Sequence, residues 1–409
     1  MQLESILQRV LGDELPVHVR AYDGSAVGPP DAPATVVLRS PAALQRILTS
    51  PGELGFARAY VAGDLDVEGD IFAALELRDR LPEVRLTPGQ LAQVARALGW
   101  RGIRPVSVPP EEARLRGRRH SRSRDAAAIA HHYDVGNDFY RIILGPSLTY
   151  SCAVFEHDGA TLEAAQAAKY ELICGKLGLA DGMRLLDVGC GWGSMLLHAA
   201  DRYGVDAVGV TLAHEQAGMA KKRIAEQGVA NQVEVRLQDE RDVNDGPYDA
   251  ISSIGMFEHV GEGRLAEYFE HLFALLRPGG RLLNHGISRP PGEKPRLQRA
   301  GFVDRYVFPD GELHEVGRVV SVMQTAGFEV RHVESLREHY ARTLRCWSAN
   351  LEASWDEAVQ LVGLARARIW RLYMAGCALN FEAGRTQIHQ VLAVRPDGGA
   401  SGMGLRPTW

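Results

Sequence analysis

An apolar run at 183–188 predicts a buried strand, and further runs with strand character recur along the chain after it. Segments with the apolar spacing of helices alternate with the first five runs. This alternation is typical of α/β proteins and predicts a parallel sheet with helices on both faces. The predicted strands are 183–188, 206–210, 232–236, 248–254, 280–285, 328–334 and 386–394.

The segment 340–382, between the last two predicted strands, has helical spacing and many large apolar side chains. Most of these side chains are expected to belong to an ordinary core. The others could line an apolar tunnel over the strand ends, where α/β folds bind their ligands. The pattern thus predicts one large domain at 125–409, which the motifs described below identify as the catalytic domain, with 340–382 as a helical insertion.

Residues 1–100 have the pattern of a separate small α/β domain, which we expect either to dimerise the protein or to dock it on a bilayer. Strand character is present at 15–22 and 34–38, and helical spacing at 42–48. The acidic stretch 64–70 carries four carboxylates. Their spacing does not match an EF-hand, so this stretch predicts a solvated turn.

Residues 101–124 are predicted to be a linker, because three prolines interrupt any helix there. The linker is strongly basic, and its arginines face only Glu111 and Glu112. Two interpretations stay open: a solvated tether, and a clamp for anionic lipid headgroups. The arginines are Arg101, Arg104, Arg114, Arg116, Arg118, Arg119, Arg122 and Arg124.

A glycine-rich turn follows the first predicted strand of the catalytic domain. Gly189, Gly191 and Gly193 alternate with other residues directly after Asp187, and a helical pattern begins at Ser194. Such a turn brings backbone N–H groups against a ligand, beside the positive end of a helix. The spacing differs from that of dinucleotide folds and resembles the first motif of S-adenosylmethionine-dependent methyltransferases.

Polar residues follow the next two predicted strands. Thr211, Leu212 and Gln216 stand where dinucleotide folds place an acid for the ribose hydroxyls, and Thr and Gln can bind hydroxyls without charge. The run Asp239-Glu240-Arg241 offers carboxylates for an adenine amino group. Because these residues sit at successive strand ends, they predict the rest of a nucleoside site.

Composition narrows the class of protein. The 409 residues are 45% hydrophobic and carry a net charge of -5, which argues against nucleic acid as a partner. No apolar stretch is long enough to span a membrane, and the N-terminus does not have the pattern of a secretory signal. The five widely spaced cysteines argue against a disulfide framework or a metal site and for a cytoplasmic protein.

Three further runs make the resemblance to methyltransferases more specific. They are Tyr150-Ser151-Cys152, Phe257-Glu258-His259 and Tyr340-Ala341-Arg342-Thr343-Leu344. Together with the glycine motif they resemble the cyclopropane-fatty-acyl-phospholipid synthase and mycolic acid cyclopropane synthase family. The resemblance covers about 131–394. It implies a class I S-adenosylmethionine methyltransferase, with a Rossmann-like seven-stranded sheet and a helical lid.

The resemblance implies methyl transfer from S-adenosylmethionine to a cis double bond of an unsaturated phospholipid or other acyl lipid. An alkene is a weak nucleophile, so it must lie in line with the methyl group. The resulting carbocation needs a dry site, aromatic faces that stabilise it and a base that removes one proton. In the family this base is a bound bicarbonate ion.

The family's site residues map onto this chain by motif. The resemblance assigns bicarbonate binding to the side chains of Glu258, His285 and Tyr340 and to the backbone of Cys152 and Ile287. A second set, Tyr133, Tyr150 and Ser151, matches positions around the methionine end of the cofactor. Cys377 matches a cysteine that has been considered catalytic, although a buried helical thiol is usually inert.

One departure from the family lies beside the anion site. The family often has His-Thr-Ile where this chain has His285-Gly286-Ile287, and Gly286 is expected to open space or add conformational freedom there. The segments 51–70, 302–311 and 405–409 resemble an actinobacterial branch that makes 10-methylene acyl chains, the precursors of 10-methyl branches such as that of tuberculostearic acid. Both the ring and the methylene product pass through one cation, so the resemblance leaves the product open.

Two other functions stay open from the sequence: a small-molecule N- or O-methyltransferase, and a non-catalytic lipid-binding protein. The preferred interpretation is a lipid methyltransferase that forms a homodimer, with the arginine-rich linker on an anionic membrane surface. It would then act in the cytoplasm, at the inner face of the membrane.

Overall fold

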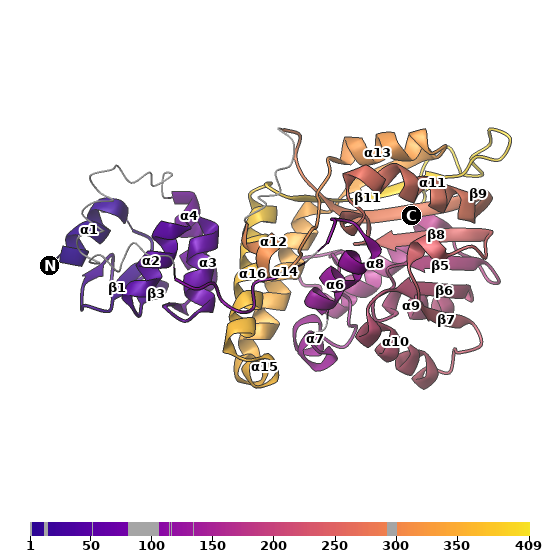
Figure 1. Cartoon of the computed structure of the whole chain (residues 1–409). Helices are drawn as coiled ribbons and strands as arrows, with labels where there is room; N and C mark the ends of the chain where they lie inside the picture. The colour runs from indigo at the N-terminus through magenta and orange to yellow at the C-terminus, as the bar shows by residue number, and fades with distance from the viewer. Residues whose placement is uncertain are drawn as a thin grey trace. The chain divides into compact units, whose positions relative to one another are not determined.

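The computed structural model describes residues 2–11, 15–50, 52–80, 106–113, 115, 117–133, 135–292 and 301–409. The chain forms two compact units. The first consists of Met1–Arg114, Arg299–Val307 and Ser354–Leu379, and the second of Leu115–Gln298, Phe308–Ala353 and Asn380–Trp409. Figure 1 shows the elements of both units along the chain.

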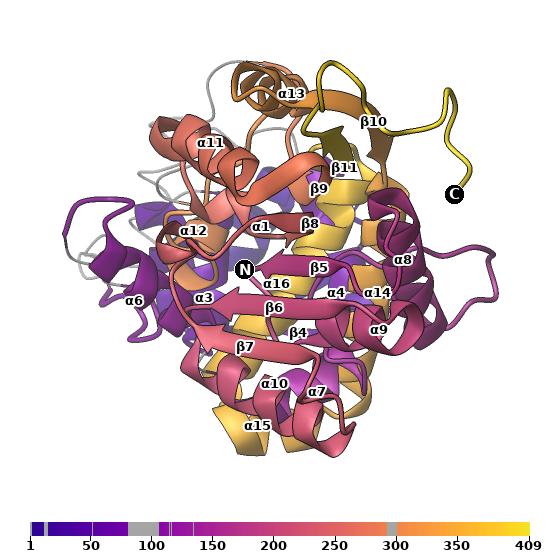
Figure 2. The same cartoon turned by 90° about the vertical axis from the view of Figure 1, so that its right-hand side faces the viewer.

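A seven-stranded sheet organises the second unit in the part of the chain that the structure describes. Its order is β10-β11-β9-β8-β5-β6-β7. Strands β9, β8, β5, β6 and β7 are parallel, whereas β11 is antiparallel to both of its neighbours. Figure 2 shows β8, β5, β6 and β7 side by side. The strands are β5 Arg184–Val188, β6 Asp206–Thr211, β7 Val233–Leu237, β8 Tyr248–Ile254, β9 Leu276–Ser288, β10 Glu329–Ser335 and β11 Gln387–Val394.

Helices cover both faces of this sheet, which confirms the predicted α/β fold. Along β5, Leu185 packs toward one face and Leu186 toward the other, each in its own apolar cluster. The first cluster joins α8, α9 and α10 to the sheet, and the second joins α11 and α13. These helices are α8 Leu162–Leu177, α9 Ser194–Tyr203, α10 His214–Glu226, α11 Leu265–Leu275 and α13 Val316–Thr325.

The first unit contains a small sheet of order β2-β1-β3-β4 in its described residues. The strand expected at 34–38 is β3 Ala34–Leu38, the one expected within 15–22 is β1 His18–Ala21, and the helix expected at 42–48 is α2 Pro41–Thr49. Ser40 caps α2 by accepting a hydrogen bond from the Ala42 backbone N–H. The other elements are α1 Gln2–Leu11, β2 Ala26–Val27, α3 Glu53–Val61, β4 Leu65–Gly69, α4 Ile71–Arg80, α12 Phe302–Tyr306 and α15 Trp355–Val362.

The acidic stretch 64–70 is not a solvated turn, as its composition suggested, because most of it forms β4. Leu65 and Val67 point into the core, and the carboxylates alternate with them. Asp66 accepts a hydrogen bond from Arg368 at 2.8 Å, which joins the stretch 354–379 to the small sheet. The carboxylates of this stretch therefore lie on the face of β4 opposite to Leu65 and Val67, where Asp66 pairs with an arginine.

The segment 340–382 is helical, as expected, and its helices are shared between the two units. Helix α14 Arg337–Ala353 belongs to the second unit, while α16 Leu364–Glu382 lies mostly in the first. No helix among the described residues is long and apolar enough to cross a membrane.

Part of the arginine-rich segment is paired with carboxylates of its own unit. Arg119 and Arg124 both form ion pairs with Asp310, and Arg122 forms one with Asp242. Arg118 is exposed. The other arginines of the predicted linker, Arg101, Arg104, Arg114 and Arg116, lie outside the described residues. In the described part, therefore, three of these guanidinium groups pair with carboxylates of the second unit.

Candidate active site

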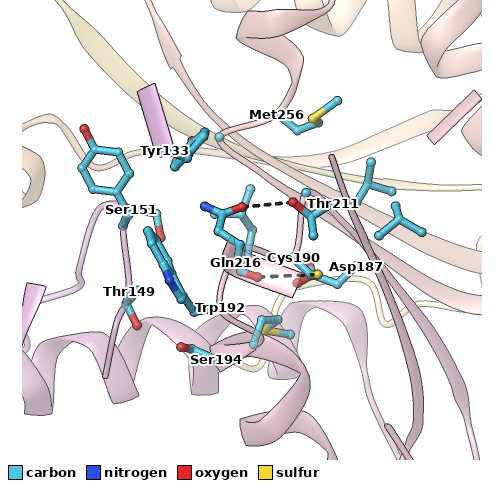
Figure 3. Close-up of a pocket in the computed structure, with 18 of the residues that line it drawn as sticks. Tyr133, Thr149, Ser151, Asp187, Cys190, Trp192, Ser194, Thr211, Gln216 and Met256 are labelled. Carbon is cyan, nitrogen blue, oxygen red and sulfur yellow. Dashed lines mark hydrogen bonds between the residues drawn. The ribbon is translucent and has the colours of Figure 1, made fainter. Parts of the chain in front are cut away.

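A cavity of about 900 Å³, counting the open space at its mouth, lies at the carboxyl ends of β5, β6 and β8. The turns that follow these strands line it, together with the segment 148–151 and helix α6 Arg122–Tyr133. This is the edge of a parallel sheet at which α/β folds bind ligands. Figure 3 shows the cavity with its labelled side chains.

The glycine-rich turn after β5 forms the floor of the cavity. Gly189, Gly191 and Gly193 all have positive φ, at 78°, 55° and 79°, a conformation that other residues adopt only at a cost. Gly189 and Gly191 line the cavity, whereas Gly193 caps α9 and packs against Ala220. The alternating glycines are therefore a requirement of the backbone of this turn.

Most of the residues predicted to bind a cofactor line this one cavity. They are Tyr133, Tyr150, Ser151, Asp187, Gly189, Gly191, Thr211, Leu212, Gln216 and Glu240. Gly193, Asp239 and Arg241 do not line it. Instead, Asp239 pairs with Arg241, which also contacts Asp125. Asp239 and Arg241 therefore fix the turn after β7 that presents Glu240.

Two buried hydrogen bonds fix polar groups at the strand ends. Thr211 donates to Gln216 Oε1 at 3.0 Å, and Figure 3 marks this bond with a dashed line between the two labelled side chains. Asp187 accepts from the Ser252 hydroxyl at 2.6 Å. Burial raises the pKa of Asp187 to about 6, so it is mostly ionised at neutral pH. A carboxylate at this depth can accept hydrogen bonds from a nucleoside or an amine.

Sequence reasoning missed Lys169, whose side chain is fully buried at the cavity wall. Its Nζ donates to Ser151 Oγ at 2.9 Å. Burial lowers the pKa of this amine to about 7. The sequence did contain a sign of this burial, because Lys169 lies four residues before Ile173 and so on the same, core-facing side of α8.

Other lining residues that the sequence did not single out come from the same turns. Trp192 is positioned by a hydrogen bond from its Nε1 to Asn137 Oδ1 at 2.7 Å. Thr149 shares a hydrogen bond of 2.9 Å with the Tyr170 hydroxyl. The remaining ones include Cys190, Ser194, Gln238, Met256 and His259.

A second group of predicted residues lies at the end of β9. Glu258 Oε1 accepts a hydrogen bond of 2.7 Å from the Ile287 backbone N–H. Its other oxygen, Oε2, is buried and has no hydrogen-bond partner among the described residues. Burial raises the pKa of this carboxyl to about 7. Burial, and to a smaller extent the charge of Glu258, raises the pKa of the cavity residue Tyr133.

His285 lies two residues before Ile287 on β9 and is 1% exposed. Its Nδ1 contacts the Gln390 amide nitrogen at 3.2 Å. Its Nε2 is buried without a hydrogen-bond partner in the part of the chain that the structure describes. Burial and the charges of Lys169 and Lys176 hold the pKa of His285 well below its usual value, so the ring is neutral.

Cys152 and Tyr340 meet at the start of α14. The Cys152 thiol lies 3.7 Å from the Leu336 carbonyl, which also accepts from the Tyr340 backbone N–H. Leu336 in turn donates to Ile388, the cross-strand partner of Ile287. Burial raises the pKa of the Cys152 thiol, so it stays protonated. The structure thus brings five of the six predicted catalytic residues to one end of β9.

Aromatic rings connect the two groups of residues. Tyr133 and Tyr150, at the cavity, have ring centroids 6.3 Å apart. Trp347 lies 5.2 Å from Tyr150 and 6.0 Å from Tyr340. A continuous aromatic wall therefore runs from the cofactor cavity to Tyr340. Cys377 belongs to the stretch 354–379 of the first unit, and its role stays a prediction.

Gly286 does not open space beside this site, contrary to expectation. A Cβ atom on Gly286 would lie 1.9 Å from Cε1 of Phe257. The Phe257 ring, which is 1% exposed, thus fills the volume of the missing side chain. Because Phe257 precedes Glu258, the glycine lets this ring pack where it positions the carboxylate.

The comparisons with known proteins agree with this geometry. A sequence model of the family described as mycolic acid cyclopropane synthetase matches residues 120–391. A protein of Mycobacterium tuberculosis named "Probable fatty acid methyltransferase Rv3720" is 48% identical and is covered over 95% of its length by 96% of this chain. A protein of Pseudomonas putida named "Probable fatty acid methyltransferase" is 40% identical, with 97% of this chain and 95% of that protein covered.

A solved structure of the mycolic acid cyclopropane synthase CmaA1 in complex with SAH and CTAB is also similar. Its TM-score is 0.62 at 37% identity, and the match covers 66% of this chain and 98% of that one. About one third of the present chain thus extends beyond this match, whereas the two fatty acid methyltransferases match nearly all of it.

Proposed function

Because the chain belongs to the mycolic acid cyclopropane synthetase family and is an S-adenosylmethionine-dependent methyltransferase of the cyclopropane synthase type, we propose that it methylates the cis double bond of an unsaturated phospholipid acyl chain. The proposed product is a 10-methylene branched chain, with a cyclopropane ring as the alternative. When bound, S-adenosylmethionine would supply the methyl group and bicarbonate would accept the proton lost from the acyl chain.

The observation that supports a bound anion is a pair of buried polar atoms. His285 Nε2 and Glu258 Oε2 have no hydrogen-bond partner among the described residues. Leaving such groups unpaired costs about 1–3 kcal/mol each, so native proteins rarely keep them without a purpose. A neutral histidine donor and a carboxylate acceptor match the oxygen and the hydroxyl of bicarbonate. Glu258, His285 and Tyr340 would hold this ion by side chain. The backbone of Cys152 and Ile287 would complete the site, with the Ile287 N–H already donating to Glu258 Oε1.

The surroundings suit a reaction that must exclude water. Tyr150, Trp347 and Tyr340 present ring faces and edges along one wall, and aromatic faces stabilise cations. Trp347 is fully buried. The chain's own contribution is then to keep water from the cationic acyl chain and to orient the base on one side of it.

The choice of acyl substrate rests on the extent of the similarity. The relatives named as fatty acid methyltransferases match the first 100 residues as well as the catalytic domain, since the aligned share of this chain is 96–97%. We propose that this added part serves a phospholipid substrate, by docking the enzyme on the inner face of a membrane or by forming a homodimer. Deletion of residues 1–124 tests this role, because unchanged activity on liposomes contradicts it.

The activity is tested with purified full-length protein, S-adenosylmethionine and liposomes of oleoyl phospholipid. Proton NMR of the released acyl chains distinguishes the isomeric products, which mass alone does not. Vinylidene protons are the expected result, and upfield ring protons would identify a cyclopropane synthase instead. If neither signal arises while a small amine or phenol is methylated, the lipid proposal is wrong.

Lys169 is proposed to balance the carboxylate of the methionine part of the cofactor. Replacement of Lys169 by methionine keeps the size of the side chain and removes its charge. The dissociation constant for S-adenosylmethionine, measured by calorimetry, is expected to rise about 10- to 100-fold, the equivalent of one charge-assisted hydrogen bond. In the wild type, affinity should fall as pH rises above 7, because the amine, whose pKa burial lowers to about 7, then loses its proton.

The matched control is Lys222→Met, which removes an exposed lysine from α10. This variant should bind the cofactor like the wild type. An unchanged affinity in Lys169→Met would show that the amine serves only to hold the Ser151 hydroxyl.

A further inference from the structure

A row of polar side chains crosses three strands next to His285. Glu334 on β10 is paired in register with Gln390 on β11, and Gln390 with His285 on β9. On this face of the sheet, α8 adds Lys176 in its last turn. Lys176 and Gln390 have no exposed surface. Buried polar residues in such number are costly, so their arrangement calls for a purpose.

The hydrogen bonds along this row have a fixed direction. Burial lowers the pKa of Lys176, but its ion pair with Glu334 opposes this and favours the ammonium form, which can only donate. It donates to Gln390 Oε1 at 2.6 Å. The other end of the Gln390 amide, Nε2, lies 3.2 Å from His285 Nδ1. The lysine therefore decides which end of the amide faces the histidine.

An amide NH₂ group can only donate, so His285 Nδ1 must accept and cannot carry a proton. The proton of the neutral ring is then on Nε2, the atom that lacks a partner among the described residues. We infer that Lys176 and Gln390 are positioning residues, which hold His285 in its Nε2–H tautomer so that it donates to the anion of the proposed function.

This inference rests on the proposed function only for the identity of the acceptor. The tautomer itself is a property of the resting protein. In ¹⁵N-histidine-labelled full-length protein, the imidazole nitrogen shifts report which atom carries the proton, and His285→Gln assigns the signal. We expect Nε2–H and a bare Nδ1 from pH 6 to 9. A proton on Nδ1 at neutral pH would overturn the inference without any variant.

Gln390→Glu is the most informative substitution, because a carboxylate accepts where the amide donated. His285 should then carry a proton on Nδ1, as an imidazolium at low pH and as the Nδ1–H tautomer at high pH. Only the imidazolium still donates from Nε2. At saturating S-adenosylmethionine, the kcat of the variant should therefore gain an alkaline limb that the wild-type kcat lacks, and at pH 9 it should be about 100-fold lower than in the wild type. Its affinity for S-adenosylmethionine should be unchanged.

Two further variants separate this role from a structural one. Gln387→Glu makes the same change three residues earlier on β11, on the opposite face, and should leave both the tautomer and the pH profile unchanged. Lys176→Met removes the donor that fixes the Gln390 amide, so the amide can flip by 180°. A mixture of both His285 tautomers is then expected.

The outcomes distinguish the proposed function from the inferred positioning of His285 by Lys176 and Gln390, which is called the relay below. Nε2–H in a protein that methylates no lipid would support the relay and contradict the function. Lipid methylation with an unchanged pH profile in Gln390→Glu would support the function and overturn the relay.

Discussion

Replacement of Glu258 by glutamine is expected to lower kcat for lipid methylation about 1,000-fold, while the affinity for S-adenosylmethionine stays within about twofold. The size of the loss is that of removing a group that orients a catalytic base. Glu258 Oε1 is anchored on the Ile287 N–H, which leaves Oε2 to accept from the base. An amide keeps the shape of the side chain but points a donor or a weaker acceptor at that place.

The pH dependence follows from the pKa of Glu258, which burial raises to about 7. The ionised form is the one that accepts, so wild-type activity should fall as pH drops below 7. In Glu258→Gln this acidic limb should disappear from the small residual activity. A pH profile of kcat/KM on liposomes measures both.

The raised pKa of Glu258 also predicts that stability, unlike activity, is favoured at low pH. Because the folded pKa lies above the unfolded value of about 4.5, the protonated carboxyl favours the fold fully below pH 4.5, and this contribution is lost as pH rises through 7. A difference of that size corresponds to about 3 kcal/mol at pH 8. Glu258→Gln should therefore unfold at a higher temperature than the wild type at pH 8, and at nearly the same temperature at pH 4.5.

The control is Glu270→Gln, on the exposed side of α11, which should change neither activity nor stability. A Glu258→Gln enzyme with normal turnover would contradict the anion site. One that loses activity and is also less stable at pH 8 would indicate that the carboxylate is a structural ion and not an acceptor kept for a ligand.

The fold was predictable because it depends on patterns that are local in sequence. Most strands of the large sheet are apolar runs, and the glycines after β5 stand at positions with positive φ, where glycine is favoured. The acidic strand β4 shows the limit of composition as a guide. Its apolar Leu65 and Val67 already had strand spacing, but four carboxylates concealed it.

The candidate site was predictable only where a motif carried it. Glu258, His285 and Tyr340 are far apart in sequence, and the resemblance to a family joined them before any geometry did. Lys169, Lys176 and Gln390 belong to no such motif. Their roles depend on which helix face meets which strand, and this is decided by tertiary packing. Two buried lysines seven residues apart on α8 are a signal, but only once that face is known to be covered.

The Phe257 ring explains why position 286 must be glycine, and it gives the second large effect. Gly286→Ala is expected to destabilise the protein by at least about 3 kcal/mol and to lower its unfolding temperature by roughly 5–10 °C. An added Cβ would lie 1.9 Å from Phe257 Cε1, and the ring is enclosed on all sides. Displacement of this ring also moves Glu258, so lipid methylation should be lost together with stability.

The cause can be separated from a general intolerance of substitution. Gly218→Ala, on α10 where nothing lies within 4 Å of the new Cβ, should be neutral or stabilising by up to about 1 kcal/mol. Phe257→Leu makes room for a side chain at 286, so the double variant Phe257→Leu/Gly286→Ala should be less destabilised than the sum of its parts by about 1–2 kcal/mol. Strict additivity in that cycle would mean that the ring can move away from residue 286 at little cost. A threonine at position 286, as the family often has, would then be compatible with Phe257. The glycine would be needed for the backbone conformation of β9 and not for the packing of the ring.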